Sequence, residues 1–110
     1  MTRFELFCLV FYALDAAWDD SHSKQLGQYL SDANPFLWGG QSSANPAVYD
    51  EFCKSVAQEI ISVEDSYDVA CGYINTLSGN YVKAVLKAFS TVTKEKWLDG
   101  AKKYLSRAHE

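Results

Sequence analysis

Apolar residues recur at spacings of three and four along most of the chain, a pattern typical of amphipathic helices. Residues 94–108 give the cleanest example, because their apolar side chains gather on a single helical face. Strict alternation of apolar and polar residues, which marks strands, is sustained nowhere. The pattern predicts an all-α protein, a compact bundle of five to six short helices around a central apolar N-terminal helix.

The central helix is predicted over residues 3–18. Phe4, Phe7, Phe11 and Leu14 mark one apolar face, and a second apolar face lies beside it. A helix that is apolar nearly all round is normally buried by its neighbours. The alternative is that one of these faces is left for a partner chain.

Capping signals divide the rest of the chain. Asn45 and Pro46 provide an N-cap followed by proline at the first helical position, and Ser62 and Thr93 are further N-cap candidates. The oxygens of Asp19, Asp20 and Ser21 are expected to cap the second helix. Helices after the first are predicted at about 22–32, 46–61, 63–77, 80–89 and 94–108.

The predicted helices also specify which side chains are buried. The third predicted helix places Val56 and Ile60 on its buried stripe, and the fifth places Leu86 inside. Connections are short and no linker or repeat interrupts the chain, so residues 1–110 are predicted to form one domain.

Charge is unevenly distributed in a chain of 110 residues with a formal net charge of −4. Acidic side chains dominate residues 1–80, whereas basic side chains dominate residues 81–110. A net negative charge disfavours nucleic acid as a partner, and the apolar run of residues 6–14 is far shorter than the ~20 residues that span a bilayer. We therefore expect neither a nucleic-acid nor a membrane partner. The basic C-terminal part is either a docking face or a solvated surface.

Cysteine usage indicates the compartment. Cys8, Cys53 and Cys71 are odd in number, lie among apolar residues and form no CxxC pair. We expect reduced core thiols, a cytoplasmic protein and no cofactor.

A loop with three consecutive large apolar residues, Phe36, Leu37 and Trp38, is the most unusual local feature. It either plugs the end of the bundle or presents an aromatic contact to a protein partner. Lys83 and Lys87, four residues apart, are the second candidate for partner binding, and further basic residues (Lys96, Lys103 and Arg107) recur along the last helix.

The best candidate for metal or acid–base chemistry is the cluster of Asp15, Asp19, Asp20 and His22, because carboxylates four residues apart share a helical face. The spacing fits no defined ligand motif, and a solvated acidic helix end explains the same residues. We predict no metal ligand and no catalytic residue here.

The segments of residues 29–38 (YLSDANPFLW) and 44–52 (ANPAVYDEF) are similar to small helical bacterial proteins known mainly as hypothetical or of unknown function. The resemblance implies a helical fold and no particular activity.

Two hypotheses follow for the function. The first is a small protein-binding or regulatory module, such as an adaptor, an antitoxin- or immunity-like protein, or a subunit that self-associates. The second is a small metal-dependent or acid–base enzyme that uses the Asp15, Asp19, Asp20 and His22 cluster. The missing catalytic motifs favour the first.

Overall fold

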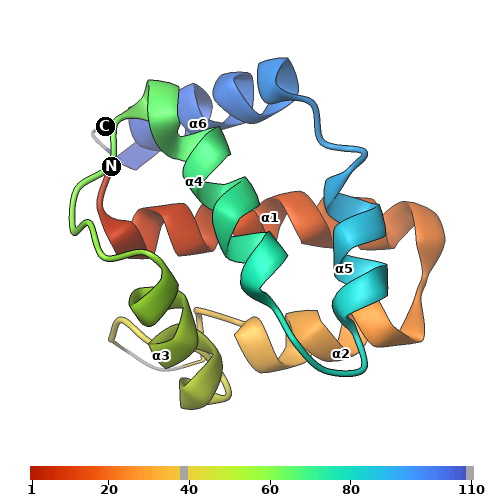
Figure 1. Ribbon diagram of the computed structural model, residues 1–110. Helices are drawn as coiled ribbons and strands as arrows, with labels where there is room; N and C mark the ends of the chain where they lie inside the picture. Colours follow the sequence, from red (N-terminus) through yellow and green to blue (C-terminus); the bar gives the residue numbers. More distant parts are fainter. Residues whose placement is uncertain (38–39, 109–110) are drawn as a thin grey trace.

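The computed structural model describes residues 1–37 and 40–108, and this part of the chain is all-α as predicted (Figure 1). Its six helices pack into one globule. They are α1 (Arg3–Ser21), α2 (Lys24–Ala33), α3 (Pro46–Ser55), α4 (Val63–Thr76), α5 (Val82–Phe89) and α6 (Lys94–Ala108).

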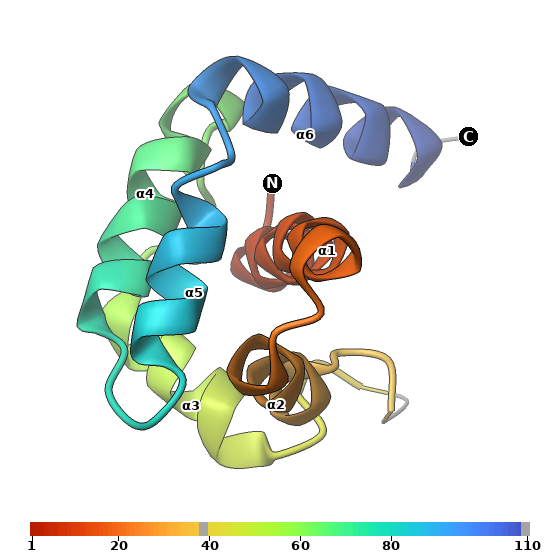
Figure 2. The same ribbon diagram turned by 90° about the vertical axis from the view of Figure 1, so that its right-hand side faces the viewer.

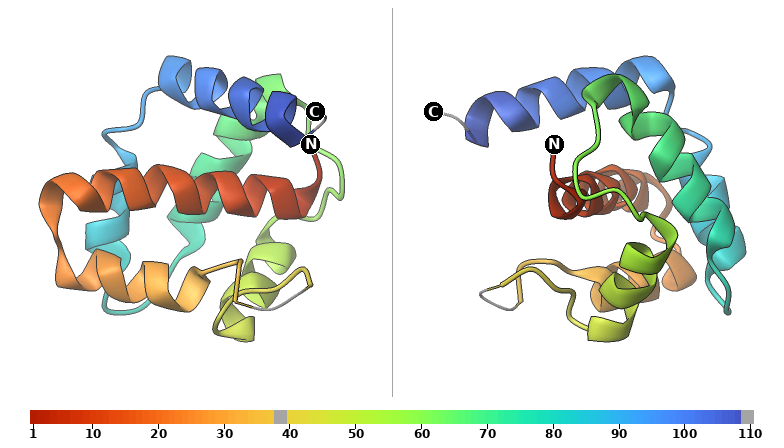
Figure 3. Two further views of the ribbon diagram at one scale, coloured as in Figure 1. Left: turned by 180° about the vertical axis from the view of Figure 1, so that it is seen from behind. Right: turned by 60° about the vertical axis from the view of Figure 1, so that its left-hand side comes forward.

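The N-terminal helix α1 is the centre of the bundle, as its apolar pattern predicts. It contacts each of the other five helices. Figure 2 views α1 nearly along its axis, with α6 above it, α2 below it and α4 and α5 to one side. The left panel of Figure 3 shows the molecule from behind the view of Figure 1. There α1 runs across the molecule between α6 and α2, with no helix in front of it. The bundle therefore surrounds α1 incompletely.

The start of α1 at Arg3 agrees with the prediction, whereas its end lies three residues later than predicted. At the start, the Thr2 hydroxyl accepts a hydrogen bond from the Glu5 amide (3.1 Å) while the Thr2 amide donates to the Glu5 carboxylate (2.8 Å), a complete capping box. At the end, the helix continues to Ser21 and stops at His22, whose φ of 51° is left-handed. The prediction that Asp19, Asp20 or Ser21 is the N-cap of α2 is wrong, because all three lie within α1 and a later residue occupies the N-cap position. That residue is Ser23, which accepts from the amide of Leu26.

The third helix is shorter than predicted. It begins at Pro46 behind the predicted Asn45 cap but ends at Ser55, because residues 59–61 leave the helix and pair with the start of the chain. The Arg3 amide donates to the Glu59 carbonyl (2.9 Å) and the Ile61 amide to the Met1 carbonyl (2.8 Å).

This extended segment changes which residues are buried. In an extended segment successive side chains point to opposite sides, so Ile61 is buried and Ile60 is 71% exposed. The prediction that Ile60 is buried is therefore wrong. Val56 remains buried as predicted, although it is the C-cap of α3 rather than a helical residue. Among the later elements, α5 starts at Val82 and leaves Leu86, also predicted inside, at the surface. The predicted caps Ser62 and Thr93 are both confirmed by hydrogen bonds to the amides three residues on.

Two hydrogen bonds connect polar side chains inside the core. The hydroxyls of Tyr29 on α2 and Tyr73 on α4 lie 2.9 Å apart, and the Trp97 indole nitrogen on α6 donates to the Ser66 hydroxyl on α4 at 2.8 Å. Within the described residues, no buried side-chain nitrogen or oxygen lacks a hydrogen-bond partner. Burial of these polar atoms therefore costs little folding free energy, because their hydrogen bonds are satisfied.

The three cysteines form no disulfide. Cys8 is buried in the core, whereas Cys53 and Cys71 are half-buried at its edge. No helix in the described part of the chain combines the length and apolar character needed to cross a membrane.

Candidate functional site: an apolar groove between α1 and α6

One face of α1 is left uncovered by the rest of the bundle. Leu6, Val10 and Leu14 on its covered side are at most 1% exposed, whereas Tyr12 is 44% exposed. Ala16, one turn after Tyr12, is also exposed. Because Tyr12 and Ala16 are four residues apart, they form an apolar strip along α1, with the exposed Asp15 and Asp19 beside it but outside the groove lining.

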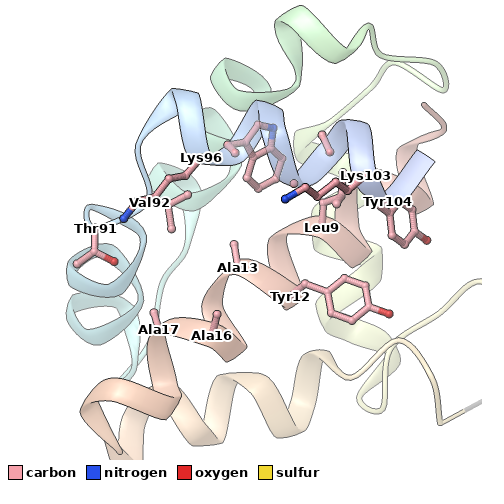
Figure 4. A pocket seen from close by; sticks show the side chains of 13 residues that line it. Leu9, Tyr12, Ala13, Ala16, Ala17, Thr91, Val92, Lys96, Lys103 and Tyr104 are labelled. Carbon is pink, nitrogen blue, oxygen red and sulfur yellow. The ribbon is translucent and has the colours of Figure 1, made fainter. Parts of the chain in front are cut away.

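This strip is one wall of a groove of about 840 Å³, whose other wall is α6 (Figure 4). The volume lies within the usual range for binding pockets, roughly 300–1,000 Å³. Residues 9–17 of α1 and 96–104 of α6 contribute, so each wall is about 12 Å long at 1.5 Å per residue. The lining residues are Leu9, Tyr12, Ala13, Ala16, Ala17, Thr91, Val92, Lys96, Trp97, Gly100, Ala101, Lys103 and Tyr104.

Small side chains make up much of the surface of this groove. Ala13, Ala16 and Ala17 come from α1, and Gly100 and Ala101 from α6. A Cβ atom added at Gly100 would meet no atom within 4 Å, so the space above this glycine is open. Short side chains on both walls allow the backbone of another element to approach closely.

Aromatic rings gather at one end of the groove, which we call the aromatic end (Tyr12, Phe36 and Tyr104). The ring of Tyr12 lies 6.0 Å from that of Tyr104 and 5.6 Å from that of Phe36, and Phe36 also contacts Phe11 at 5.9 Å, centroid to centroid. These are contact distances for aromatic pairs. The loop after α2 therefore extends the apolar surface beyond the groove itself.

Two lysines of α6 supply the charge at the groove. Figure 4 shows Lys96 reaching toward Thr91 at the far end and Lys103 reaching over the middle. The Lys103 ammonium lies 3.1 Å from the Asp99 carboxylate, and both side chains are largely exposed. Lys96 makes no ion pair with any described residue. The groove is thus apolar inside and positively charged along its α6 edge.

The thiol nearest to the aromatic end is chemically quiet. Burial raises the pKa of Cys8 to about 11, an effect that a hydrogen bond from Tyr104 only partly offsets. Burial likewise raises the pKa of Tyr104 to about 12. At neutral pH both groups keep their protons, so this end of the groove offers neither a thiolate nucleophile nor a phenolate base.

The predicted partner-binding residues fall in two places. Phe36, which belongs to the aromatic end, is 55% exposed, and Leu37 next to it in the chain is 60% exposed. Trp38 lies outside the described residues. Lys83 and Lys87 are exposed on α5 and do not line the groove. Their role in partner binding remains a prediction.

The structure places the acidic cluster considered for metal binding at the C-terminal end of α1, and the side chain of Asp20 lies outside the described part of the chain. Asp15 and Asp19 are exposed on α1, Asp20 also belongs to α1, and the His22 ring packs against Trp18 at 5.0 Å. Across the described residues, no three His, Cys, Asp or Glu side chains are placed to hold a metal ion. The enzyme hypothesis remains without a structural observation in its favour.

Sequence reasoning missed the α1 side of the groove. The sequence placed Ala13 and Ala17 on a second apolar face that could be left for a partner, but it did not assign Tyr12 or Ala16 to that face. The informative signal is side-chain size: Ala13, Ala16 and Ala17 are apolar but too small to fill a core.

No protein-family model, no curated protein and no solved structure matches this chain. The similarity of residues 29–38 and 44–52 to small helical bacterial proteins therefore remains a prediction.

Proposed function

We propose that this protein is a small protein-binding module, and that the groove between α1 and α6 receives an amphipathic helix of a partner protein. One observation carries the proposal: the central apolar helix of the fold has an uncovered face, which lies in a groove of about 840 Å³. Exposed apolar surface of this kind, bordered by charge, is typical of interaction sites.

A helix suits this groove better than an extended segment does. Both long walls are helices, whose backbone amides and carbonyls are already hydrogen-bonded within each helix, so they offer no sheet edge to which a strand could add. A helix satisfies its own backbone and needs only an apolar surface on which to dock. The alanines and Gly100 allow interaxial distances of about 8–10 Å, the spacing at which helices pack.

The charge at the groove favours an acidic partner. Lys96 and Lys103 border the apolar surface, and the last thirty residues carry seven basic against three acidic side chains. Complementary charge steers association and selects the partner. The aromatic end adds tyrosine and phenylalanine rings, which often contribute strongly to binding at interfaces.

The test uses a synthetic helical peptide of about 18 residues with leucines on one face and glutamates beside them, long enough to extend past the groove at both ends. Binding is followed by amide chemical shifts of the labelled protein and by calorimetry. We expect the shifts to concentrate on residues 9–17 and 96–104.

Two glycines provide matched variants. Gly100 and Gly72 are both exposed helical glycines above which a Cβ meets no atom within 4 Å, but only Gly100 lines the groove. Gly100→Phe should fill the groove and weaken the peptide by at least about tenfold, roughly 1.4 kcal/mol, while Gly72→Phe leaves it unchanged. Circular dichroism checks that both variants fold.

Two results would overturn the proposal. One is equal binding of the peptide to both glycine variants, which would place the site elsewhere. The other is a dimer in light scattering that Gly100→Phe dissociates, which would make a second copy of the chain the occupant of the groove.

A further inference from the structure

Resting on the proposed function, we infer a residue pattern for the partner helix. It lies along α6 and carries two carboxylates seven residues apart, which pair with Lys96 and Lys103. Beyond them along the same axis, a bulky apolar side chain packs against the aromatic end.

The spacing of the lysines sets the first part of this pattern. Lys96 and Lys103 are seven residues apart, which is two helical turns and about 10.5 Å along the axis. Figure 4 shows both side chains on the groove side of α6. A helix packed alongside repeats at the same interval, so carboxylates at positions i and i+7 face both lysines together.

Both lysines are available to a partner. Lys96 has no ion-pair partner among the described residues, and the pair between Lys103 and Asp99 joins side chains that are 72% and 68% exposed. An exposed pair of this kind is weak, so a carboxylate held beside Lys103 by a docked helix competes with Asp99 successfully. The apolar groove wall also excludes water from one side of the new pair, which strengthens it.

The aromatic end gives the pattern a direction. The ammonium groups lie toward the Thr91 end and the middle of the groove, whereas Tyr12, Tyr104 and Phe36 occupy the other end. Along α6 the partner therefore meets a charge, a second charge and then a ring-lined apolar surface. A large aliphatic or aromatic side chain suits the last position, where Tyr12 and Phe36 are each about half exposed.

Three peptides that share one leucine face test the charge register. The first carries glutamate at i and i+7, the second glutamine at both positions, and the third two glutamates moved to the opposite face. At low salt we expect the first to bind roughly three- to tenfold more tightly than the other two.

Charge reversal of the protein identifies the lysines. Lys96→Glu or Lys103→Glu should remove most of the advantage of the first peptide, and a peptide with lysine at the matching position should recover binding to that variant. Lys102→Glu is the matched control, because Lys102 is an exposed lysine of α6 that does not line the groove. It should leave the difference between the peptides intact.

The outcomes separate the two proposals. If all three peptides bind equally and Gly100→Phe still blocks them, the groove is the docking site and the charge register is wrong. If none binds, or if Gly100→Phe blocks none of them, the proposed function itself fails.

A leucine-to-alanine change in the first peptide, at the position nearest the aromatic end, tests the apolar contact. It should weaken binding to the natural chain more than to Tyr12→Ala, since the contact is already missing in that variant. Equal weakening would place the bulky side chain elsewhere.

Discussion

The covered face of α1 and the part of its open face that lines the groove are both apolar, yet they serve different purposes. The covered face carries Leu6, Val10 and Leu14, which are at most 1% exposed, whereas the open face carries alanines together with Tyr12, 44% exposed. Hydropathy alone does not separate the two faces. Side-chain size does, because large aliphatic groups fill the core and alanines leave a groove that the chain's own residues do not fill.

This difference teaches how a small helical protein can keep a stable core and a docking surface on one helix. The covered face holds the fold together, so changes there should reduce the free energy of unfolding. The open face is bordered by Lys96, Lys103 and the aromatic end, so changes there should act mainly on binding. The following predictions are ordered by the size of the expected effect on stability.

The largest effect should come from truncation on the covered face. Leu14→Ala removes a fully buried side chain and should lower the free energy of unfolding by about 2–5 kcal/mol, through lost burial and the cavity that remains. Tyr12→Ala on the open face should cost about 1 kcal/mol or less, because its ring is only half covered. Urea denaturation measures both. Similar losses would show that the open face is part of the structural core.

Alkaline pH should destabilise the protein through its buried tyrosine pair. Burial raises the pKa of Tyr73 to about 12, and burial with the nearby Tyr73 raises that of Tyr29 well above its ordinary value. The folded chain then holds protons that the unfolded chain releases, so the contribution of this pair to stability is constant below about pH 10 and falls as the pH rises toward 12. Cys8 adds a loss that begins near its ordinary pKa of 9.0.

For Tyr73 alone the loss by pH 12 should be about 2–3 kcal/mol. Urea denaturation at several pH values measures it, and absorbance of the phenolate reports the titration. Tyr73→Phe is the control: it should make the decline between pH 10 and 12 shallower, while the decline that comes from Cys8 and Tyr104 remains. An unchanged slope in that variant would assign the decline to other groups.

A smaller effect should follow from removing the indole donor beneath the groove. Trp97→Phe deletes the hydrogen bond to Ser66 and part of a ring that is 4% exposed, and should cost about 1–2 kcal/mol. In a double-mutant cycle with Ser66→Ala the two changes should be less than additive, because each removes the same bond. Full additivity in thermal or urea unfolding would contradict the shared contact.

The smallest effect should be a gain. Gly100→Ala and Gly72→Ala should each stabilise the protein by about 0.5–1 kcal/mol, since alanine loses less conformational entropy in a helix than glycine and the space for Cβ is open at both sites. The two variants should differ in peptide binding, which only Gly100→Ala should reduce. Loss of stability in Gly100→Ala would show that the groove wall is tighter than the structure indicates.

Much of the fold could be predicted from local signals. Asn45 with Pro46, Ser62 and Thr93 cap helices where the sequence indicates, because a capping side chain bonds to an amide only two or three residues away. The end of α3 could not be predicted in this way. It depends on hydrogen bonds between Met1, Arg3 and residues 59–61, which no local pattern reveals.

The candidate site divides along the same line. An uncovered face on the N-terminal helix was one alternative raised by its apolar pattern, and Lys96 and Lys103 stood out on the last helix. Their meeting in one groove depends on how α6 packs against α4 and α1, and the buried hydrogen bond of Trp97 with Ser66 holds α6 on α4. Phe36 was notable in sequence, but its contact with Tyr12 follows only from the path of the loop.

The order of α1 before the helices that cover it has a consequence for biosynthesis. A ribosome adds about 5–20 residues per second, and Trp97, which packs over α1, follows Leu14 by about 80 residues. About 4–16 s therefore pass between the synthesis of this apolar helix and the synthesis of α6, the last helix that packs against it. Until α2 to α5 have been made and packed against α1, its leucines and phenylalanines are open to chaperones and to other nascent chains.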